Sequence, residues 1–390
     1  MNRPIVAFAH HPWVEPEWMN RQQILSRLGQ RGWPVAYSCG PLDVWQRHSA
    51  RWQNSPWFDT FVERDHARDI QAGKLGARWR RFPIFDRFAI ARHARFIRST
   101  VAGRDERIIA MLFDPQFYPY VEHLEPCDVV FHAYDSYAGQ AGWDDGKALF
   151  QAALVTHANL ITASSEAIAR YLGDPRVRVL PNGADVDAFT DAGNLAEPPD
   201  LKALPRPRLG YVGAINRKVD LKLIADVASD RPEWQWVLVG RMERAELVSD
   251  PNLTEHFARC EVLPNVHFVG QKNRLEVPAY VGHMDINTMC YRVDGNGWWK
   301  AIYPLKLHEY LAVGLPVIST PVESVLPFKD VVKIAKNANE WIEGVSCYLA
   351  SENAQQRQMQ IATARANSWD SRVSQLEQWL HEATAGDSGS

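Results

Sequence analysis

The chemistry that the sequence indicates most directly centres on Lys306 and Glu309. They lie in the segment Tyr303–Thr320, whose pattern predicts a helix followed at once by a buried strand. Pro304 suits the first helical position and Gly314 suits the C-terminal cap. Lys306 would then lie in the first turn, where backbone N–H groups and the helix dipole favour an anion. The pair could hold the phosphate and the sugar diol of a nucleotide sugar, or it could be an exposed i,i+3 ion pair.

A second candidate is the loop that follows the predicted strand Arg208–Val212. Gly213 allows a tight turn beside a ligand, and Arg217 and Lys218 offer cations for a diphosphate. This loop is not a GxGxxG dinucleotide fingerprint, and the sequence contains no GxxxxGK[ST] phosphate loop. The alternative is a plain βα loop with solvated basic residues.

A third candidate is Asp135, which follows the apolar strand predicted at Val129–His132. A carboxylate at this position can act as a general base towards an attacking hydroxyl group. His132 is an alternative base. It is also possible to interpret Asp135 as a turn cap and His132 as a buried strand residue.

Two further loops follow predicted strands. The loop from His10 to Trp13 contains adjacent histidines, which point to opposite faces of an extended chain and do not form a metal site by themselves. We expect this loop, with His11, Trp13 and Arg21, to face an acceptor or to be structural. Tyr291 could stack on a nucleobase or ribose, with 294–300 as a gate, or it could pack at the sheet edge.

The segment Lys74–Arg107 combines ten basic residues and three acidic residues with five interleaved aromatic residues. A basic face beside an aromatic face suits adsorption on anionic lipid. It also resembles a nucleic-acid-binding surface. The alternative is a solvated helix whose aromatic side faces the core.

The composition limits the function classes. The chain has 390 residues, 46% hydrophobic residues and 23% charged residues, which suits two globular domains. A net charge of −3 provides no overall field towards nucleic acid or membrane. Five scattered cysteines without a CxxC pair indicate neither a disulfide framework nor a zinc site. No signal peptide is evident and no apolar run reaches the roughly 18 residues of a membrane span, so we expect a cytoplasmic protein.

The order of predicted elements indicates an α/β fold with parallel, doubly wound sheets. Short apolar strands alternate with helical segments on both sides of a proline-rich stretch, which we interpret as a linker. The expected organisation is a Rossmann-like N-terminal domain at 1–191, a hinge at 192–207, a Rossmann-like C-terminal domain at 208–367, and a C-terminal helix at 368–385 that returns to the first domain.

Together these residues resemble a two-domain glycosyltransferase of the GT-B class. The resemblance rests on three segments. Ala312–Val317 fits an AxGxPV signature, Val179–Asp185 resembles a PNGVD turn, and Val266–Gly270 resembles a strand lining a base pocket. It implies a C-terminal domain that binds a nucleotide sugar, an N-terminal domain that binds the acceptor, and two Rossmann-like domains facing across a cleft.

One departure from the family pattern narrows the expectation. Many retaining members carry two glutamates eight residues apart, but Ala301 stands eight residues before Glu309. The sequence around Lys306 looks closer to the xanthan-type glucuronosyltransferases of bacterial exopolysaccharide assembly. That likeness implies Lys306 on the diphosphate, Tyr291 and Gln271 near the nucleotide, and Asp135 as the base of an inverting reaction.

The same likeness implies a UDP-sugar donor, no metal and no other cofactor. The acceptor would be a saccharide or a polyprenyl-linked sugar at the inner membrane face, which the basic and aromatic segment could contact, and no nucleic acid would be bound. Three alternatives stay open: a retaining transferase on a soluble acceptor, another nucleotide-sugar enzyme such as an epimerase or phosphorylase, and a non-catalytic two-domain binding protein.

Overall fold

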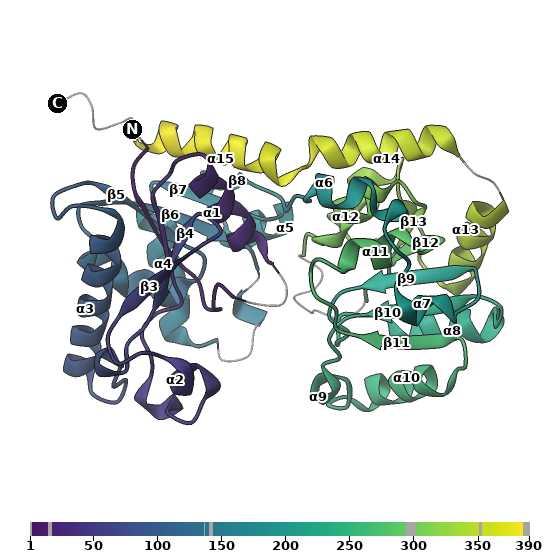
Figure 1. Cartoon of the computed structure of the whole chain (residues 1–390), viewed down its shortest axis with the longest axis horizontal. Coiled ribbons are helices and arrows are strands. Elements are labelled where there is room, and N and C mark those ends of the chain that lie inside the picture. The colour runs from purple at the N-terminus through teal and green to yellow at the C-terminus, as the bar shows by residue number, and fades with distance from the viewer. Residues whose placement is uncertain are drawn as a thin grey trace. The chain divides into compact units, whose positions relative to one another are not determined.

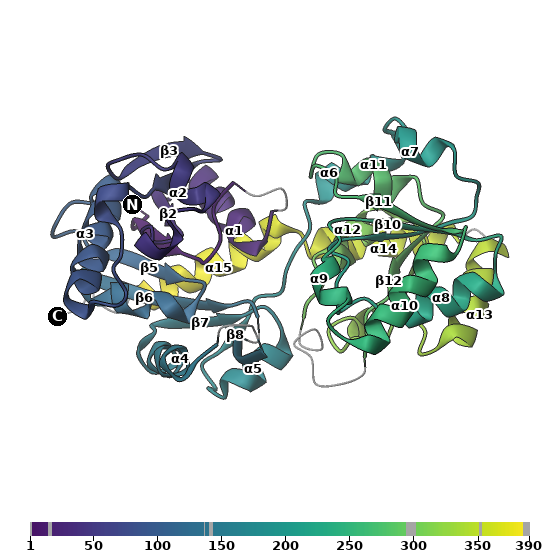
Figure 2. The same ribbon diagram turned by 90° about the horizontal axis from the view of Figure 1, so that it is seen from below.

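The computed structural model describes residues 2–14, 18–135, 137–139, 143–293, 302–350 and 353–384. The predicted gate at 294–300 and Ala301 lie outside these residues. Contacts divide the chain into two compact units, Met1–Pro181 with Arg372–Ser390, and Asn182–Ser371. Figures 1 and 2 show that each unit has a central sheet with helices on both faces.

Unit 1 has an eight-stranded sheet in the order β3-β4-β2-β1-β5-β6-β7-β8, in which only β3 pairs antiparallel among the described residues. The strands are β1 (Ile5–Phe8), β2 (Val35–Ser38), β3 (Thr60–Arg64), β4 (Ala67–Gln71), β5 (Ile108–Leu112), β6 (Cys127–Ala133), β7 (Leu160–Ala163) and β8 (Arg178–Val179). The helices are α1 (Asn20–Gln30), α2 (Ala50–Asn54), α3 (Pro83–Val101), α4 (Asp145–His157), α5 (Glu166–Leu172) and most of α15 (Trp369–Thr384).

Unit 2 has a six-stranded parallel sheet in the order β11-β10-β9-β12-β13-β14. The strands are β9 (Arg208–Val212), β10 (Gln235–Val239), β11 (Val266–Gly270), β12 (Ile286–Met289), β13 (Val317–Ser319) and β14 (Lys333–Ile334). The helices are α6 (Val186–Thr190), α7 (Pro199–Lys202), α8 (Leu221–Asp230), α9 (Arg244–Leu247), α10 (Pro251–Val262), α11 (Val277–Gly282), α12 (Lys306–Val313), α13 (Ala338–Ala350) and α14 (Ala354–Ala366).

The central strands are buried on both faces, which explains their continuous apolar sequences. Every residue of β1, β5, β6 and β10 is buried. Helix α8 packs against α10, and α12 packs against α14. In Figure 2, α7 and α11 lie on one side of the second sheet, and α8, α10 and α13 lie on the other. A parallel sheet covered in this way requires Val, Ile and Leu at successive positions rather than an alternating pattern.

Both sheets reverse their strand order beside their first strand. In unit 1 the reversal falls between β1 and β5, and in unit 2 it falls between β9 and β12. Ligands on doubly wound sheets bind outside the carboxyl ends of the strands at such a reversal. The loops after these four strands are therefore the places to examine for chemistry.

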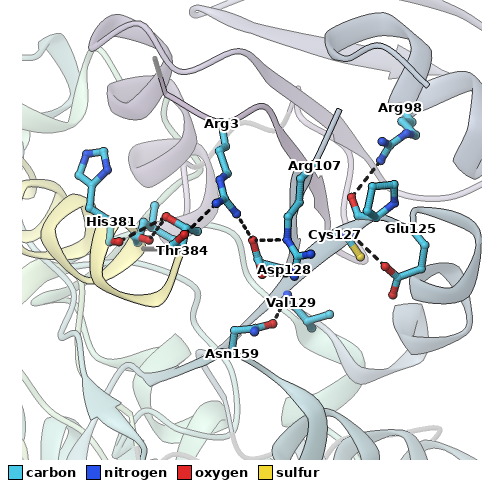
Figure 3. Close-up of polar contacts among 12 residues, drawn as sticks. Arg3, Arg98, Arg107, Glu125, Cys127, Asp128, Val129, Asn159, His381 and Thr384 are labelled. Atoms are coloured by element: carbon cyan, nitrogen blue, oxygen red, sulfur yellow. Dashed lines mark hydrogen bonds and ion pairs between the residues drawn. The ribbon is translucent and has the colours of Figure 1, made fainter. Parts of the chain in front are cut away.

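The C-terminal helix is held on unit 1 by hydrogen bonds around a buried carboxylate, which lies where the strands of the sheet begin (Figure 3). Asp128, at the start of β6, accepts two hydrogen bonds from the Arg107 guanidinium at 3.1 and 2.8 Å and another from Arg3. Arg3 also donates to the Thr384 carbonyl at 2.7 Å. Trp33 adds an indole N–H bond of 2.8 Å to Glu377 of α15. The two ends of the chain are thus held by the same unit.

The structure differs from the expectation for the linker at 192–207. The boundaries between the units fall at Pro181 and Ser371, so the proline-rich stretch belongs to unit 2. Its prolines lead into the short helix α7, which buries Leu201 completely against the sheet. The Arg208 guanidinium donates to the Leu201 carbonyl at 2.7 Å and fixes the stretch further. Local composition shows where proline interrupts periodicity, but not which unit the segment packs on.

Candidate functional site

The reversal point in unit 2 is built on two glycines with unusual backbone angles. Gly213 follows β9 with φ +142°, and Gly240 follows β10 with φ +151°. A Cβ at Gly240 would lie 2.1 Å from the Gly213 carbonyl oxygen, and a Cβ at Gly213 would lie 2.7 Å from Lys306 Nζ. Only glycine permits both the conformation and this closeness. The structure therefore brings Gly213 and Lys306, two predicted donor residues, together.

The Lys306 side chain is held against two tyrosine rings. It is 7% exposed, and its Nζ lies 3.5 Å from the centroid of the Tyr211 ring and 5.2 Å from that of Tyr291. Tyr291 is itself buried, and Thr320 Oγ1 donates to its carbonyl at 2.7 Å. The ring face that we expected to stack on a base is thus taken up by packing, and we assign Tyr291 to the support of Lys306. Cation–π contact can hold an ammonium group in place without neutralising its charge.

A hydrogen bond between helix α12 and strand β9 fixes the position of Lys306. The Val212 N–H donates to the hydroxyl of Tyr310 at 2.8 Å, which fixes the helix beside the Gly213 loop. The helix begins at Lys306, two residues later than the proline suggested, and the side chain of its N-cap residue, Leu305, makes no capping hydrogen bond. Gly314 ends it with φ +72°, which confirms the predicted cap. The Leu307 N–H donates to the Pro304 carbonyl at 3.2 Å, and the dipole of the helix favours an anion at this end.

Glu309 lies one turn after Lys306 and is half-buried. Desolvation raises the pKa of its carboxyl group from 4.5 to about 7, Lys306 lowers it, and the Asp185 carboxylate raises it further. The carboxyl group is therefore close enough to both charges to feel them, and it carries a proton more readily than an exposed glutamate. A group of this kind can accept or donate a hydrogen bond to a sugar hydroxyl.

The turn at residues 181–185 supports the approach to α12. The Asn182 amide donates to the Tyr303 carbonyl at 2.8 Å, and the Tyr303 hydroxyl lies 2.7 Å from His308 Nε2. A Cβ at Gly183 would lie 2.7 Å from the Trp369 nitrogen, so glycine is required there. The sequence motif marked this turn, but it did not reveal that Asp185 acts electrostatically on Glu309, because that contact joins residues far apart in the chain.

The other predicted donor residues lie further out. Arg217 is exposed in the loop after β9. The Lys218 carbonyl accepts the Arg292 N–H at 2.8 Å, which joins the loops after β9 and β12. Gln271 is exposed directly after β11. Strand β11 is two positions from β9 in the sheet, which corresponds to about 10 Å between the two strands. These three residues surround the centre formed by Gly213, Lys306 and Glu309 rather than contribute to it.

The reversal point in unit 1 brings together residues that the sequence placed far apart. Phe8 of β1 pairs with Leu112 of β5, so His10 and Asp114, each two residues beyond, follow neighbouring strands in register. The Gln116 amide lies 2.8 Å from His10 Nδ1 and donates to Asp114 at 3.1 Å. Desolvation lowers the pKa of His10, and Asp114 acts in the opposite direction. We did not identify Asp114 or Gln116 from the sequence, because no local pattern distinguishes them.

Asp135 lies two residues beyond β6, at the same edge as Asp114. It is half-buried, and it follows the carboxyl end of its strand, where ligands of doubly wound sheets bind. His132 is different: it is buried within β6 and lies 2.8 Å from the Thr162 hydroxyl. Desolvation lowers its pKa to about 4. The structural interpretation of His132 is therefore the better one, and Asp135 is the candidate base.

The three predicted acceptor-side residues divide into two kinds. His11 is exposed, whereas Trp13 and Arg21 are each 1% exposed. The Trp13 indole N–H donates to Asp65 at 3.0 Å, and its ring packs edge-on against Tyr37. Trp13 and Arg21 thus fit the structural alternative, and only His11 of the three offers its side chain to a ligand.

The described residues contain no group of three or more His, Cys, Asp or Glu side chains placed to hold a metal ion. Within the same residues, no helix combines the length and the apolar character needed to cross a lipid bilayer.

Comparison with known proteins places the fold. A sucrose-phosphate synthase from Thermosynechococcus elongatus has a TM-score of 0.70 at 18% identity, over 99% of this chain and 100% of that one. HepE of Anabaena, solved with UDP and glucose, has a TM-score of 0.66 at 13% identity, over 98% and 100%. With two Rossmann-like units, each built on a doubly wound sheet, this chain has the GT-B glycosyltransferase fold.

The sequence comparisons match part of this chain to glycosyltransferases. Residues 206–351, within unit 2, match the family described as glycosyl transferases group 1. TuaH of Bacillus subtilis, named as a teichuronic acid biosynthesis glycosyltransferase, is 30% identical over 180 residues, which are 44% of this chain and 42% of that protein. LpsB of Rhizobium meliloti, a lipopolysaccharide core biosynthesis mannosyltransferase, is 25% identical over 175 residues, or 43% and 47%. The matches span less than half the length of either relative.

Proposed function

We propose that this protein is a glycosyltransferase that moves a sugar from a nucleotide sugar to a saccharide acceptor in the synthesis of a bacterial cell-surface polysaccharide. The observation that carries the proposal is the buried Lys306 ammonium at the start of α12, beside the Gly213 backbone. The group 1 family match over 206–351 and the names of both relatives support it.

The donor is assigned to unit 2. Its diphosphate would lie at the Gly213 loop, where Lys306 and the first turn of α12 supply positive charge. Glu309, one turn away, would bind a hydroxyl pair of the ribose or the sugar. Arg217, Lys218 and Gln271 surround this centre and would contact the outer parts of the nucleotide. We propose UDP as the nucleotide, and the UDP complex of the similarly folded HepE supports that choice.

The acceptor and the catalytic base are assigned to unit 1. Asp135 would take the proton of the acceptor hydroxyl while the hydroxyl oxygen forms a bond to the anomeric carbon. The bond between that carbon and the diphosphate oxygen breaks, and the electron pair leaves with the nucleoside diphosphate. Lys306 and the helix N-terminus would stabilise the charge that develops on this leaving group, so that the reaction needs no metal. Direct displacement of this kind inverts the anomeric configuration.

We also propose that the acceptor is a lipid-linked saccharide that the protein reaches at an anionic membrane face. The physical support is the basic and aromatic segment Lys74–Arg107, whose aromatic residues before Ala89 are exposed rather than packed into the core. The exposure of these aromatic side chains supports the proposal over a solvated helix with a buried aromatic side.

A thermal-shift screen of UDP-, GDP- and TDP-sugars, followed by an assay for nucleoside diphosphate release, tests the donor assignment. We expect stabilisation by UDP-sugars and slow release of UDP in the absence of acceptor. Stabilisation by none of the three classes would contradict the proposed donor site. The anomeric configuration of the product, measured by NMR, then decides between inversion and the alternative of retention.

A further inference from the structure

The first turns of α3 form a strongly exposed apolar projection on unit 1. Ile84 is 84% exposed, Phe85 is 63% exposed and Phe88 is 67% exposed, and Phe82 directly before the helix is also exposed. We call these four residues the apolar tip. The later part of the same helix is ordinary core, because Ile90, Ala94 and Ile97 are buried. The helix is therefore anchored by its second half and presents its first half to the outside.

A second set of exposed apolar residues lies beside the tip. These are Trp45, Trp57, Phe58, Leu75 and Trp79, which we call the aromatic flank. The Trp79 ring lies 6.2 Å from Phe82, whose ring lies 6.4 Å from Phe85, so Trp79 joins the flank to the tip. Soluble proteins rarely expose apolar patches of this extent without a binding partner.

Basic side chains are interleaved with the aromatic flank. The Arg81 guanidinium lies 5.9 Å from the Trp45 ring centroid, and Lys74 Nζ lies 5.4 Å from that of Trp57. Between Lys74 and Arg98 the sequence has eight basic residues and a single acidic residue, Asp86. This residue is engaged by Arg78 through bonds of 2.8 and 2.6 Å, so it does not oppose the exposed positive charge.

The distribution of ion pairs shows which basic residues can meet a partner. Arg92 pairs with Asp59, and the buried Arg98 donates to backbone carbonyls, so both serve the fold. Arg81 and Arg95 are exposed, and no carboxylate of the described residues pairs with either. The surface therefore joins a large apolar area to uncompensated positive charge, and this combination fits anionic lipid headgroups over acyl chains.

The apolar tip also lies at the carboxyl ends of the strands of unit 1, where Asp135 and Asp114 lie. Helix α3 follows β4 and precedes β5, so it begins at the carboxyl edge of the sheet and runs back across it. His93 confirms the placement, since its Nε2 lies 2.9 Å from the hydroxyl of Ser38 at the end of β2. Asp135 and Asp114 follow strands that end at the same edge. Insertion of the tip would thus bring a membrane surface to the edge that carries the candidate base.

We propose that the apolar tip and the aromatic flank form a membrane-insertion surface, with Ile84, Phe85 and Phe88 entering the acyl boundary and Arg81, Arg95 and Lys74 contacting anionic headgroups. The binding argument stands on surface chemistry alone, whereas its role in delivering a lipid-linked acceptor rests on the proposed function. This surface extends beyond the segment that the sequence indicated, because Trp45, Trp57 and Phe58 belong to it.

Flotation of the full chain with vesicles of phosphatidylcholine, with and without phosphatidylglycerol, tests the proposal. The wild type should float with the anionic vesicles at low salt and weakly at high salt. Phe85→Ser with Phe88→Ser should lower the partition coefficient about tenfold for each side chain. Arg81→Gln with Arg95→Gln should lower it about fivefold for each charge. Leu149→Ser with Val262→Ser removes two exposed apolar side chains elsewhere, 70% and 80% exposed, and should bind as the wild type does.

The outcomes are distinct from those of the donor screen. Because the substituted residues are exposed, circular dichroism and thermal melting should match the wild type, and UDP-sugar binding without vesicles should be unchanged in every variant. Failure of the wild type to float with anionic vesicles would overturn the inference, whether or not the protein binds a nucleotide sugar. Self-association that the tip variant abolishes, in a protein that does not float, would identify the surface as a protein interface instead.

Discussion

Replacing Glu309 with glutamine should stabilise the protein at alkaline pH and weaken the proposed donor site. The folded protein holds the proton of Glu309 up to about pH 7, whereas an unfolded chain releases it near the ordinary pKa of 4.5. The folded state therefore binds more protons between these values. The free energy of unfolding must fall as the pH rises through this window, and the whole loss is present above the folded pKa.

The magnitude follows from the shift and the exposure of the side chain. Unscreened, the difference between the two pKa values corresponds to about 3 kcal/mol, and we expect about 2 kcal/mol because part of the carboxyl side chain reaches solvent. Glutamine has nearly the same shape and no charge, so E309Q should lose this pH dependence. It should unfold like the wild type near pH 4 and be more stable by roughly 2 kcal/mol near pH 8.

Urea unfolding of both proteins at the two pH values measures the effect. A matched control is Glu343→Gln, which changes an exposed glutamate on α13 and should leave the pH dependence of stability as in the wild type. Parallel pH dependence in wild type and E309Q would refute the reasoning, because it would show that the environment of Glu309 does not disfavour its charge. The same variant should bind a UDP-sugar more weakly if Glu309 contacts a hydroxyl pair of the donor.

Three further predictions test separate parts of the account. Asp135→Asn should keep UDP-sugar binding in a thermal-shift assay and lower the transfer rate about 10²–10⁴-fold. The control Asp105→Asn changes an exposed aspartate of the same unit and should transfer at the wild-type rate. Full turnover by D135N would exclude Asp135 as the base. Gly240→Ala should lower the free energy of unfolding in urea by about 3 kcal/mol or more, since the new Cβ would clash with the Gly213 carbonyl in addition to straining the backbone. The control Gly173→Ala, at a glycine with φ +68° and open space around it, should cost only about 1 kcal/mol. Equal losses would contradict the close packing at Gly213. Transfer measured after treatment with a chelator should proceed at the untreated rate, and loss that added divalent metal restores would contradict the proposed role of fixed cations.

The strands of both sheets could be predicted well because parallel strands leave a clear local signal. The strand predicted at Arg208–Val212 has the bounds of β9, and the strand predicted at Val129–His132 lies within β6 (Cys127–Ala133). Short apolar runs between helical segments arise because both faces of such strands are buried. The β3–β4 hairpin and the helices α13 and α14 were not predicted. All five residues of β3 are exposed, so no burial pattern marks this strand.

The candidate site could be predicted only where one local pattern contains the chemistry. Lys306 and Glu309 share a helix, and Gly213 follows a strand, so their types and spacing indicated a ligand. The burial of Tyr291 could not be predicted, because a strand-end tyrosine has the same local pattern whether it faces the core or a ligand. The contacts of Gln116 with both His10 and Asp114, and the effect of Asp185 on Glu309, arise between segments that are distant in the sequence.

The most direct test of the central claim is the affinity of the purified full chain for a UDP-sugar, measured by isothermal titration calorimetry with wild type and Lys306→Met. Methionine keeps the apolar stem against Tyr211 and removes the charge. We predict a dissociation constant about 10–100-fold higher for K306M, with Lys222→Met, a substitution of a 62% exposed lysine on α8, binding as the wild type does. Equal affinity in wild type and K306M would contradict the assignment of the donor diphosphate to this site.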